Sequence, residues 1–253
     1  MTEPEIQPAA EPVPGLSQWR RVTNTFAAPS KTFEDIKRGN KSWWLPFILS
    51  IVFAYALFGA ITMKIGWSQV AENVISVNQK SAERMAQLPA DQRASAMKFT
   101  EYLTEGILIA SPVMVLLIAV VIAGVMLGTI NFIFGGKASF GAVFTVWFYA
   151  SLPGIIKSIL GTIVIFSGMA PESFNIQNFA PTNVGAFVSI QEVGPALYRL
   201  ATALDFTTIW YLVLFSIGIS VVAGVKRSTG YFAVFGWWVI ITLLGVGYAA
   251  VAG

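Results

Sequence analysis

The chain has 253 residues, of which 55% are hydrophobic and only 11% charged, and its formal net charge is +3. A soluble domain carries about 25% charged residues, so this composition argues against a soluble protein, and the basic residues lie beside apolar runs rather than in a nucleic-acid-binding patch. The chain contains no Cys and no His, which excludes disulfides, thiolate metal sites and the commonest metal ligand and general base, so we expect no cofactor and no nucleic-acid partner.

The N-terminal region divides into two parts. Residues 1–15 are rich in Pro and Glu and predict a disordered tail. Residues 16–41 carry an apolar stripe with basic flanks, which predicts an amphipathic helix lying in the headgroup region; the alternative is a short helix packed on the cytoplasmic mouth of the bundle. The residues assigned to this interfacial helix are Trp19, Arg20, Arg21, Phe26, Phe33, Lys37 and Arg38.

Residues 42–253 contain five long apolar runs, which predict an all-α membrane protein with a five-helix transmembrane bundle. The second run is longer than the roughly 20 residues a bilayer requires, so we expect a tilt or a protruding end. The third run contains Pro153 and Lys157. The predicted spans are 44–65, 107–134, 140–166, 206–225 and 231–251.

Two longer polar segments connect the spans. Residues 67–105 predict an extramembrane helical hairpin, with a break at Leu88-Pro89 and a new helix capped by Asp91. Residues 167–203 predict a loop followed by an amphipathic helix that is broken near Gly194-Pro195.

Lys and Arg residues predict the orientation, because they gather in short loops on the cytoplasmic side. A cytoplasmic N-terminus places both very short, basic connections inside and puts the C-terminus and both long polar segments outside. The inside then holds Arg20, Arg21, Lys31, Lys37, Arg38, Lys41, Lys137, Lys226 and Arg227, and the outside holds Lys80, Arg84, Arg93, Lys98 and Arg199.

Lys157 is the most informative polar residue within the spans, since a charge inside a membrane is costly and often functional. It follows Pro153 by four residues, and its candidate counter-charges are Asp205 and Glu105 at the outer ends of neighbouring spans. The alternative is that Lys157 makes a structural ion pair or extends its side chain to the interface.

Two further features predict helix packing. Asn131, near the inner end of the second span, predicts a hydrogen bond between helices. Gly124 and Gly128 form a GxxxG pair, which favours close packing within the bundle and, as an alternative, self-association of two chains.

Three segments form a recognisable series. The first runs from Phe26 to Ile36 and is followed by Trp43-Trp44-Leu45-Pro46. The second is the Gly-Gly turn running into Ser139-Phe140, then Phe148 to Pro153, and the third is Asp205-Phe206 continuing to the Lys226-Arg227-Ser228 turn. Together they resemble the bacterial branch of the Yip1 family of integral membrane proteins. The order and spacing of these segments carry the resemblance. It implies five transmembrane helices with a cytoplasmic N-terminus.

Eukaryotic members of the family act in vesicle trafficking and associate with small Rab GTPases and with one another. Here the region before the first span is only about forty residues, so we do not expect GTPase binding. We expect a non-enzymatic membrane-organising or adaptor protein of a bacterial inner membrane, which contacts the lipid bilayer and binds lipid, other membrane proteins or further copies of itself. The alternative is a small transporter or lipid-handling permease that uses Lys157 and Pro153. An enzyme is not expected, because no span contains a carboxylate pair at helical spacing.

Overall fold

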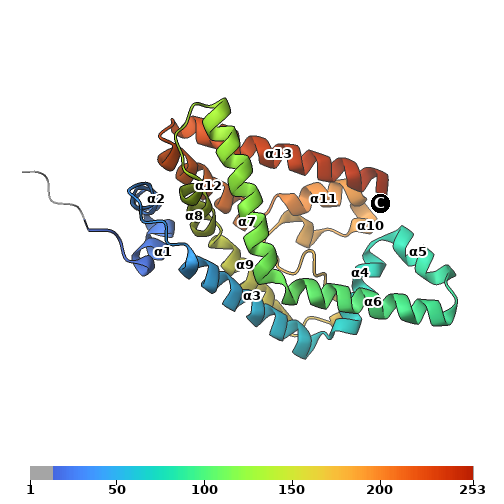
Figure 1. Cartoon of the computed structure of the whole chain (residues 1–253). Coiled ribbons are helices and arrows are strands. Elements are labelled where there is room, and N and C mark those ends of the chain that lie inside the picture. Colours follow the sequence, from blue (N-terminus) through green and yellow to red (C-terminus); the bar gives the residue numbers. More distant parts are fainter. Residues whose placement is uncertain (1–13, 253) are drawn as a thin grey trace, which may run out of the picture.

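A computed structural model describes residues 14–252, so most of the predicted N-terminal tail lies outside the described residues (Figure 1). The described part is helical and contains no named strand. Five helices or broken helices are long and apolar enough to cross a membrane, which confirms the all-α, five-span prediction. They are α3 (Trp44–Lys64), α7 with a π-helical end η1 (Ser111–Gly128 and Thr129–Ile133), α8 with α9 (Phe140–Ala150 and Pro153–Phe166), α12 (Phe206–Ala223) and α13 (Arg227–Ala252).

The N-terminal region forms two short helices, α1 (Gln18–Ala27) and α2 (Pro29–Lys37), at one end of the bundle (Figure 1). Pro29 is the first residue of α2, where its missing N–H costs little. Gly39, with φ +117°, turns the chain toward the first span. Because α2 packs against α8 and α12, the structure matches the alternative of a helix packed on the bundle.

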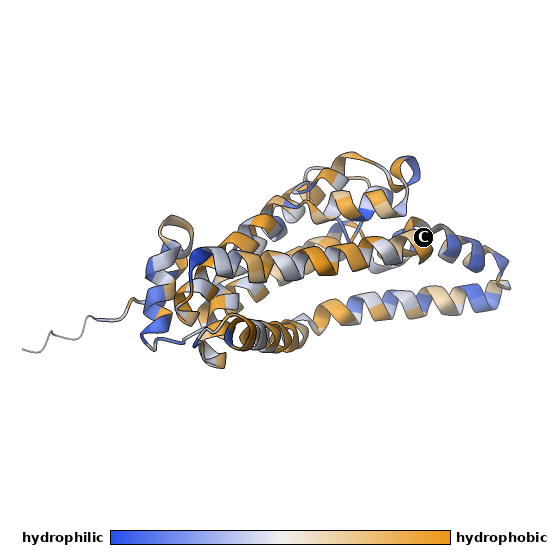
Figure 2. Ribbon diagram, turned by 90° about the horizontal axis from the view of Figure 1, so that it is seen from above, coloured by the Kyte–Doolittle hydropathy of each residue, from blue (hydrophilic) through white to orange (hydrophobic). Residues whose placement is uncertain are grey.

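α12 is the central helix of the bundle. Of its apolar span 61% is buried, against 11% for α13. It contacts α2, α8, α9 and α13, while α3 packs on α9 and α7 packs on α8. The outer helices therefore present most of their apolar side chains to lipid, and Figure 2 shows this hydrophobic middle between more polar ends.

The second and third spans depart from straight helices, as their length and proline content predicted. The long second run is divided at Ala110 into α6 (Ala90–Ile109) and α7, because Pro112 sits in the first turn of α7 and cannot continue the preceding helix. The third is divided at Ser151 and Leu152, and α9 begins at Pro153. Each proline thus begins a new helix.

The polar segments lie together at the end of the bundle opposite α1 and α2 (Figure 1). The first contains three helices where a hairpin of two was predicted, because Asn78 caps a separate α5. The break before α6 has Pro89 at the capping position, so the prediction of an Asp91 cap was wrong. The second segment breaks at Gly194, as predicted. The elements are α4 (Trp67–Val77), α5 (Gln79–Gln87), α6, η2 (Pro171–Ser173), η3 (Val184–Phe187), α10 (Ile190–Val193) and α11 (Pro195–Ala203).

Close helix packing occurs at a glycine that the sequence did not single out. A Cβ atom added to Gly124 or Gly128 would meet nothing within 4 Å, so the predicted packing of this pair within the bundle was wrong. Gly218 of α12, in contrast, lies directly against Val146 of α8, and its added Cβ would be 3.1 Å from the ring of Phe33 in α2. Gly218 is therefore what lets α2 and α8 approach the central helix.

A pair of alanine substitutions tests this assignment. Gly218→Ala is expected to destabilise the protein by about 1–3 kcal/mol, because the methyl group overlaps Val146. Gly124→Ala is expected to be neutral or to stabilise by up to about 1 kcal/mol, because its methyl group meets open space and alanine favours the helix. The thermal unfolding midpoint in detergent measures both. Equal losses would mean that Gly124 packs against another molecule.

Candidate functional site

The predicted interfacial residues separate into a buried set and an exposed set. Arg21 is 1% exposed and Phe33 is fully buried, so neither faces a headgroup region. Trp19 and Phe26 are 62% and 38% exposed, and only this edge of α1 retains the predicted apolar surface. The remaining predicted members, Arg20, Lys37 and Arg38, are exposed.

Arg21 and Asp35 form the centre of a buried polar cluster beneath α1 and α2. Arg21 Nε lies 3.6 Å from Asp35 Oδ2, and Arg21 Nη1 donates to the carbonyls of Asn40 and Ser42 at 2.9 and 3.2 Å. The guanidinium also lies over the ring of Tyr149 in α8, 5.3 Å from its centroid. A charge at this depth requires such partners. The cluster joins α1, α2 and the start of the first span to the bundle.

Lys157 and Asp205 lie together at the opposite end of the bundle. Lys157 Nζ is 2.9 Å from Asp205 Oδ2, and the side chains are 24% and 2% exposed. The pair joins α9 to the residue that precedes α12. This geometry corresponds to the structural ion pair that the sequence analysis held as an alternative to a functional lysine.

Asp205 has further hydrogen-bond donors that fix its position. Its carboxylate accepts from the hydroxyl of Thr182 at 2.7 Å, from Thr207 at 2.6 Å and from the Thr208 N–H at 3.0 Å, so it is also the N-cap of α12. Burial alone would raise the pKa of Asp205, but these hydrogen bonds together with the one from Lys157 hold its pKa below the ordinary value.

The other predicted polar residues lie elsewhere. Glu105 is half-buried on α6, and no ion pair joins it to Lys157 within residues 14–252. Asn131 lies in the π-helical end of the second span, where its side chain both donates to and accepts from the backbone of Ala138 at 2.9 Å. Asn131 therefore fixes the turn between the second and third spans, and the prediction that it bonds another helix was wrong.

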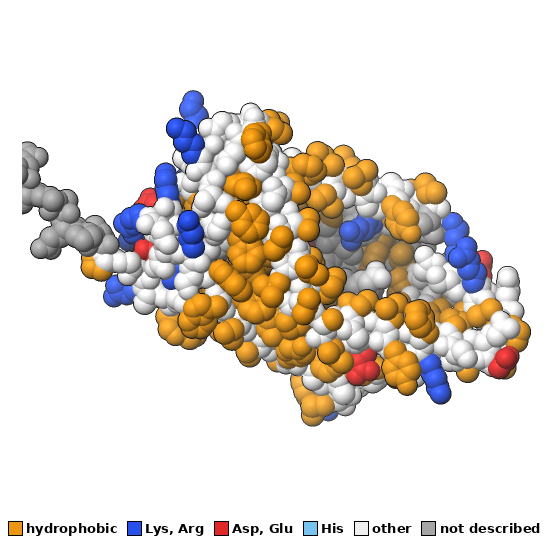
Figure 3. Space-filling view, in the orientation of Figure 1, with side chains coloured by type: hydrophobic (Ala, Val, Ile, Leu, Met, Phe, Trp, Pro, Cys, Tyr) orange, Lys and Arg blue, Asp and Glu red, His pale blue; other side chains and the backbone are white. Residues whose placement is uncertain are grey.

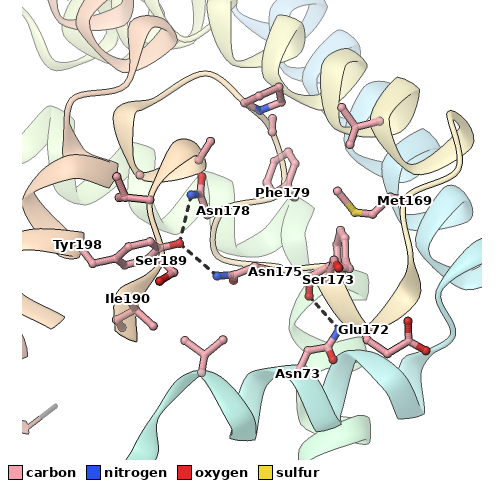
Figure 4. A pocket seen from close by; sticks show the side chains of 18 of the residues that line it. Asn73, Met169, Glu172, Ser173, Asn175, Asn178, Phe179, Ser189, Ile190 and Tyr198 are labelled. Carbon is pink, nitrogen blue, oxygen red and sulfur yellow. Dashed lines mark hydrogen bonds between the residues drawn. The ribbon is translucent and has the colours of Figure 1, made fainter. Parts of the chain in front are cut away.

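A cavity of about 600 Å³ lies next to the Lys157–Asp205 pair, among α4, the end of α9, the loop that follows it and α11 (Figure 4). Asn175 and Asn178 extend toward the hydroxyl of Tyr198 (Figure 4) and donate to it at 3.5 and 3.3 Å. Phe179 lines another wall, and the Lys157 ammonium lies 5.5 Å from the centroid of its ring. Lys157 itself does not line the cavity.

The loop carries residues that the sequence analysis read only as loop-forming. Asn183 forms an isolated antiparallel bridge with Asp205 and donates to Asn178 Oδ1 at 2.6 Å. The ion pair and the wall of the cavity are therefore parts of one hydrogen-bonded structure. A concentration of Asn residues between positions 175 and 183 was the available signal, but it does not distinguish a loop from a binding wall.

The part of the chain that the structure describes brings together no group of three Asp and Glu side chains able to hold a metal ion. The cavity is lined mainly by neutral hydrogen-bonding side chains, with Glu172 as its one acidic residue, and it lies beside the Lys157–Asp205 ion pair.

Comparison of the chain with known protein families agrees with this architecture. The profile of the Yip1 domain matches residues 23–249, which is nearly the whole described chain. No curated protein and no solved structure gives a significant match. A five-span, all-helical bundle together with a match over this length shows that the chain is a multi-pass membrane protein and belongs to the Yip1 family.

Proposed function

We propose that the chain is a non-enzymatic membrane-organising or adaptor protein that binds other membrane proteins through α6. The observation that carries this proposal is an uncovered apolar stripe on an arm formed by α4, α5 and α6. Figure 1 places this arm beyond the transmembrane helices, at the end opposite α1 and α2.

The stripe consists of Phe99, Tyr102, Leu103 and Ile107, which are 67%, 70%, 50% and 56% exposed. Their spacing places them on one face of α6. The other face of α6 packs on α4, and orange side chains follow α6 in Figure 3. A helix that carries apolar and aromatic side chains at this spacing can lie in a groove of a partner protein.

The stripe also has a position that suits a membrane partner. Ile107 lies three residues before Ala110, where the chain turns into the second span. A partner that docks on the stripe would therefore lie at the membrane surface or within it. Large exposed apolar patches on an extramembrane element mark such interaction sites.

We propose that the protein lies in the inner membrane of a bacterial cell, with its N-terminus on the cytoplasmic side. Support comes from the basic side chains around α1, α2 and the two short turns, which Figure 3 shows gathered at one end of the molecule. On this orientation the arm projects outside. Among residues 14–252, the cytoplasmic side then offers only short helices and turns, of which α2 is packed on the bundle, so GTPase binding is not part of the proposal.

The permease alternative receives less support. Lys157 is paired with Asp205, and neither Lys157 nor Pro153 lines the cavity. The central helix α12 is largely buried against its neighbours. No observation favours a transport path through this region over a structural ion pair.

Single cysteines test both the docking surface and the orientation, because the chain has no native Cys. A benzophenone maleimide on Tyr102→Cys, irradiated in native membranes, is expected to give one discrete adduct with the same membrane protein in independent preparations. Ala94→Cys, exposed near the start of α6 on a face turned away from the stripe, is the matched control and should give none. Adding Phe99→Glu should reduce the Tyr102 adduct at least about tenfold, since a buried charge weakens an apolar contact.

The control variant and a further cysteine, Ser228→Cys, report orientation. An impermeant maleimide should label Ala94→Cys in intact spheroplasts and label Ser228→Cys only after permeabilisation. The reverse pattern would overturn the orientation. Lipid adducts alone at Tyr102, or protein adducts of equal yield at Ala94, would overturn the adaptor proposal.

A further inference from the structure

We propose that the cavity beside α11 binds an uncharged, hydroxyl-rich ligand of the sugar class. This inference goes beyond the adaptor function and concerns a different surface from the stripe on α6. Its volume of about 600 Å³ falls within the range of about 300–1,000 Å³ that is usual for small-molecule sites.

The charge of the lining excludes several ligand classes. No Lys or Arg lines the cavity, so a phosphate or carboxylate ligand would have no counter-charge. Glu172 is the only ionised side chain in the lining and it is exposed to solvent. The other polar lining groups are neutral amides and hydroxyls, which include Asn73, Asn175, Asn178, Ser173, Ser189 and Tyr198.

Tyr198 presents an unused donor to the cavity. Its hydroxyl oxygen accepts from Asn175 and Asn178, and a phenol has one donor in addition to its acceptor lone pairs. Within residues 14–252, the Tyr198 hydroxyl accepts these two hydrogen bonds and donates none. Each amide also has a second N–H. A ligand with several hydroxyls can accept from all three groups and donate in return, whereas an apolar ligand would leave them unpaired.

An aromatic wall complements these donors. Phe179 packs so closely on α9 that a Cβ atom added to Gly161 would lie 2.5 Å from its ring, and Lys157 lies near the same ring. The ring is therefore held in position, and the C–H face of a sugar ring can stack on it. The Asn183 contacts to Asn178 and Asp205 likewise hold the loop segment that carries Asn178. A site with fixed walls binds with less loss of entropy.

The cavity lies at the membrane surface. Val164, which contributes to its wall, is two residues before the end of the third span, and Met169 follows shortly after that end. The sugar could therefore come from a free saccharide or from the headgroup of a glycolipid. The two sources share the chemistry that the cavity recognises.

The test uses the full chain in nanodiscs of phosphatidylcholine and phosphatidylglycerol, because the headgroup of a maltoside detergent would itself compete for the cavity. The thermal unfolding midpoint is measured with methyl glucoside or methyl mannoside in solution, and with a minor fraction of monoglucosyl diacylglycerol or of plain diacylglycerol in the disc. A ligand that binds only the folded state raises the midpoint with concentration.

Wild type is expected to be stabilised by a free glycoside or by the glucosyl lipid, and not by diacylglycerol. Tyr198→Phe removes one hydroxyl without changing the ring and should weaken binding about tenfold. Tyr248→Phe, on the exposed face of α13, is the matched control and should bind like wild type.

A response to the glucosyl lipid alone identifies a membrane source, and a response to a free glycoside identifies a soluble one. No response to any sugar, or equal binding by Tyr198→Phe, would overturn the proposal without affecting the cross-linking result on α6.

Discussion

Arg21→Met is expected to destabilise the protein by about 3–5 kcal/mol, because it leaves the Asp35 carboxylate buried without its cationic partner. Asp35 is 1% exposed and lies against the bundle. Its neutral partners, the Leu16 N–H and the Asn40 amide, donate at 3.1 and 2.9 Å but do not balance its charge. Arg38 approaches the same carboxylate at 3.5 Å, but its side chain is 52% exposed, so water screens its charge and it does not replace the buried guanidinium.

The midpoint of unfolding by SDS in mixed micelles measures this loss. Arg20→Met is the matched control, since Arg20 is adjacent and exposed, and it should change stability by less than about 0.5 kcal/mol. The double variant Arg21→Met/Asp35→Asn removes the isolated charge and keeps an acceptor, so it should recover much of the loss. A double variant no more stable than Arg21→Met would show that the loss comes from packing rather than charge.

Asp205→Ala is expected to lose about 2–4 kcal/mol, because one substitution removes the cap of α12 and the counter-charge of Lys157. It also leaves Thr182 without its acceptor. Asp205→Asn keeps the size of the side chain and one acceptor oxygen, so its loss should be clearly smaller. Equal losses in the two variants would show that the charge, rather than the cap, carries the effect.

The pH dependence of stability separates the contribution of the Asp205 charge from that of its capping role. The folded pKa of Asp205 lies below its ordinary value, and an unfolded carboxyl titrates near about pH 4. The stabilisation is therefore fully present above about pH 4 and is lost as the pH falls toward the folded pKa. The stability difference between wild type and Asp205→Asn should shrink below about pH 4. A difference that is constant with pH would contradict the assignment of the low pKa to Asp205.

The spans could be predicted because they depend on local composition. An uncharged run of about 20 residues is sufficient evidence for a membrane helix, and a proline within such a run indicates a break, as Pro153 does. Pro112 was less evident, since the apolar end of α6, residues 106–109, and the apolar start of α7 read as one long run. The division of residues 42–253 from the N-terminal region stays a prediction.

Residues whose role depends on distant partners could not be assigned. Arg21 resembles its neighbour Arg20 in sequence. Its contacts with Asp35 and with Tyr149, which is more than a hundred residues away, distinguish the buried one. Likewise Gly218 occupies no GxxxG motif, whereas Gly124 and Gly128 do and face open space. Small-residue spacing is common in apolar helices, so it does not identify which face another helix approaches. The pairing of Lys157 with Asp205 was among the stated candidates because Lys157 is a charge within a predicted span and Asp205 lies at the outer end of a neighbouring one.

The packing of α2 on α12 has a consequence for biosynthesis. α1 and α2 leave the ribosome first, yet the surface that receives Phe33 is provided by Gly218, and Ser30 accepts a hydrogen bond from Arg227 at 2.7 Å. The N-terminal helices must therefore wait until four spans have been inserted before they can dock. During that interval Arg21 and Asp35 remain hydrated and Phe33 is uncovered. Closure of this end of the molecule thus reports that the fourth span is in place, and a chain truncated before that span would expose its N-terminal helices to proteases.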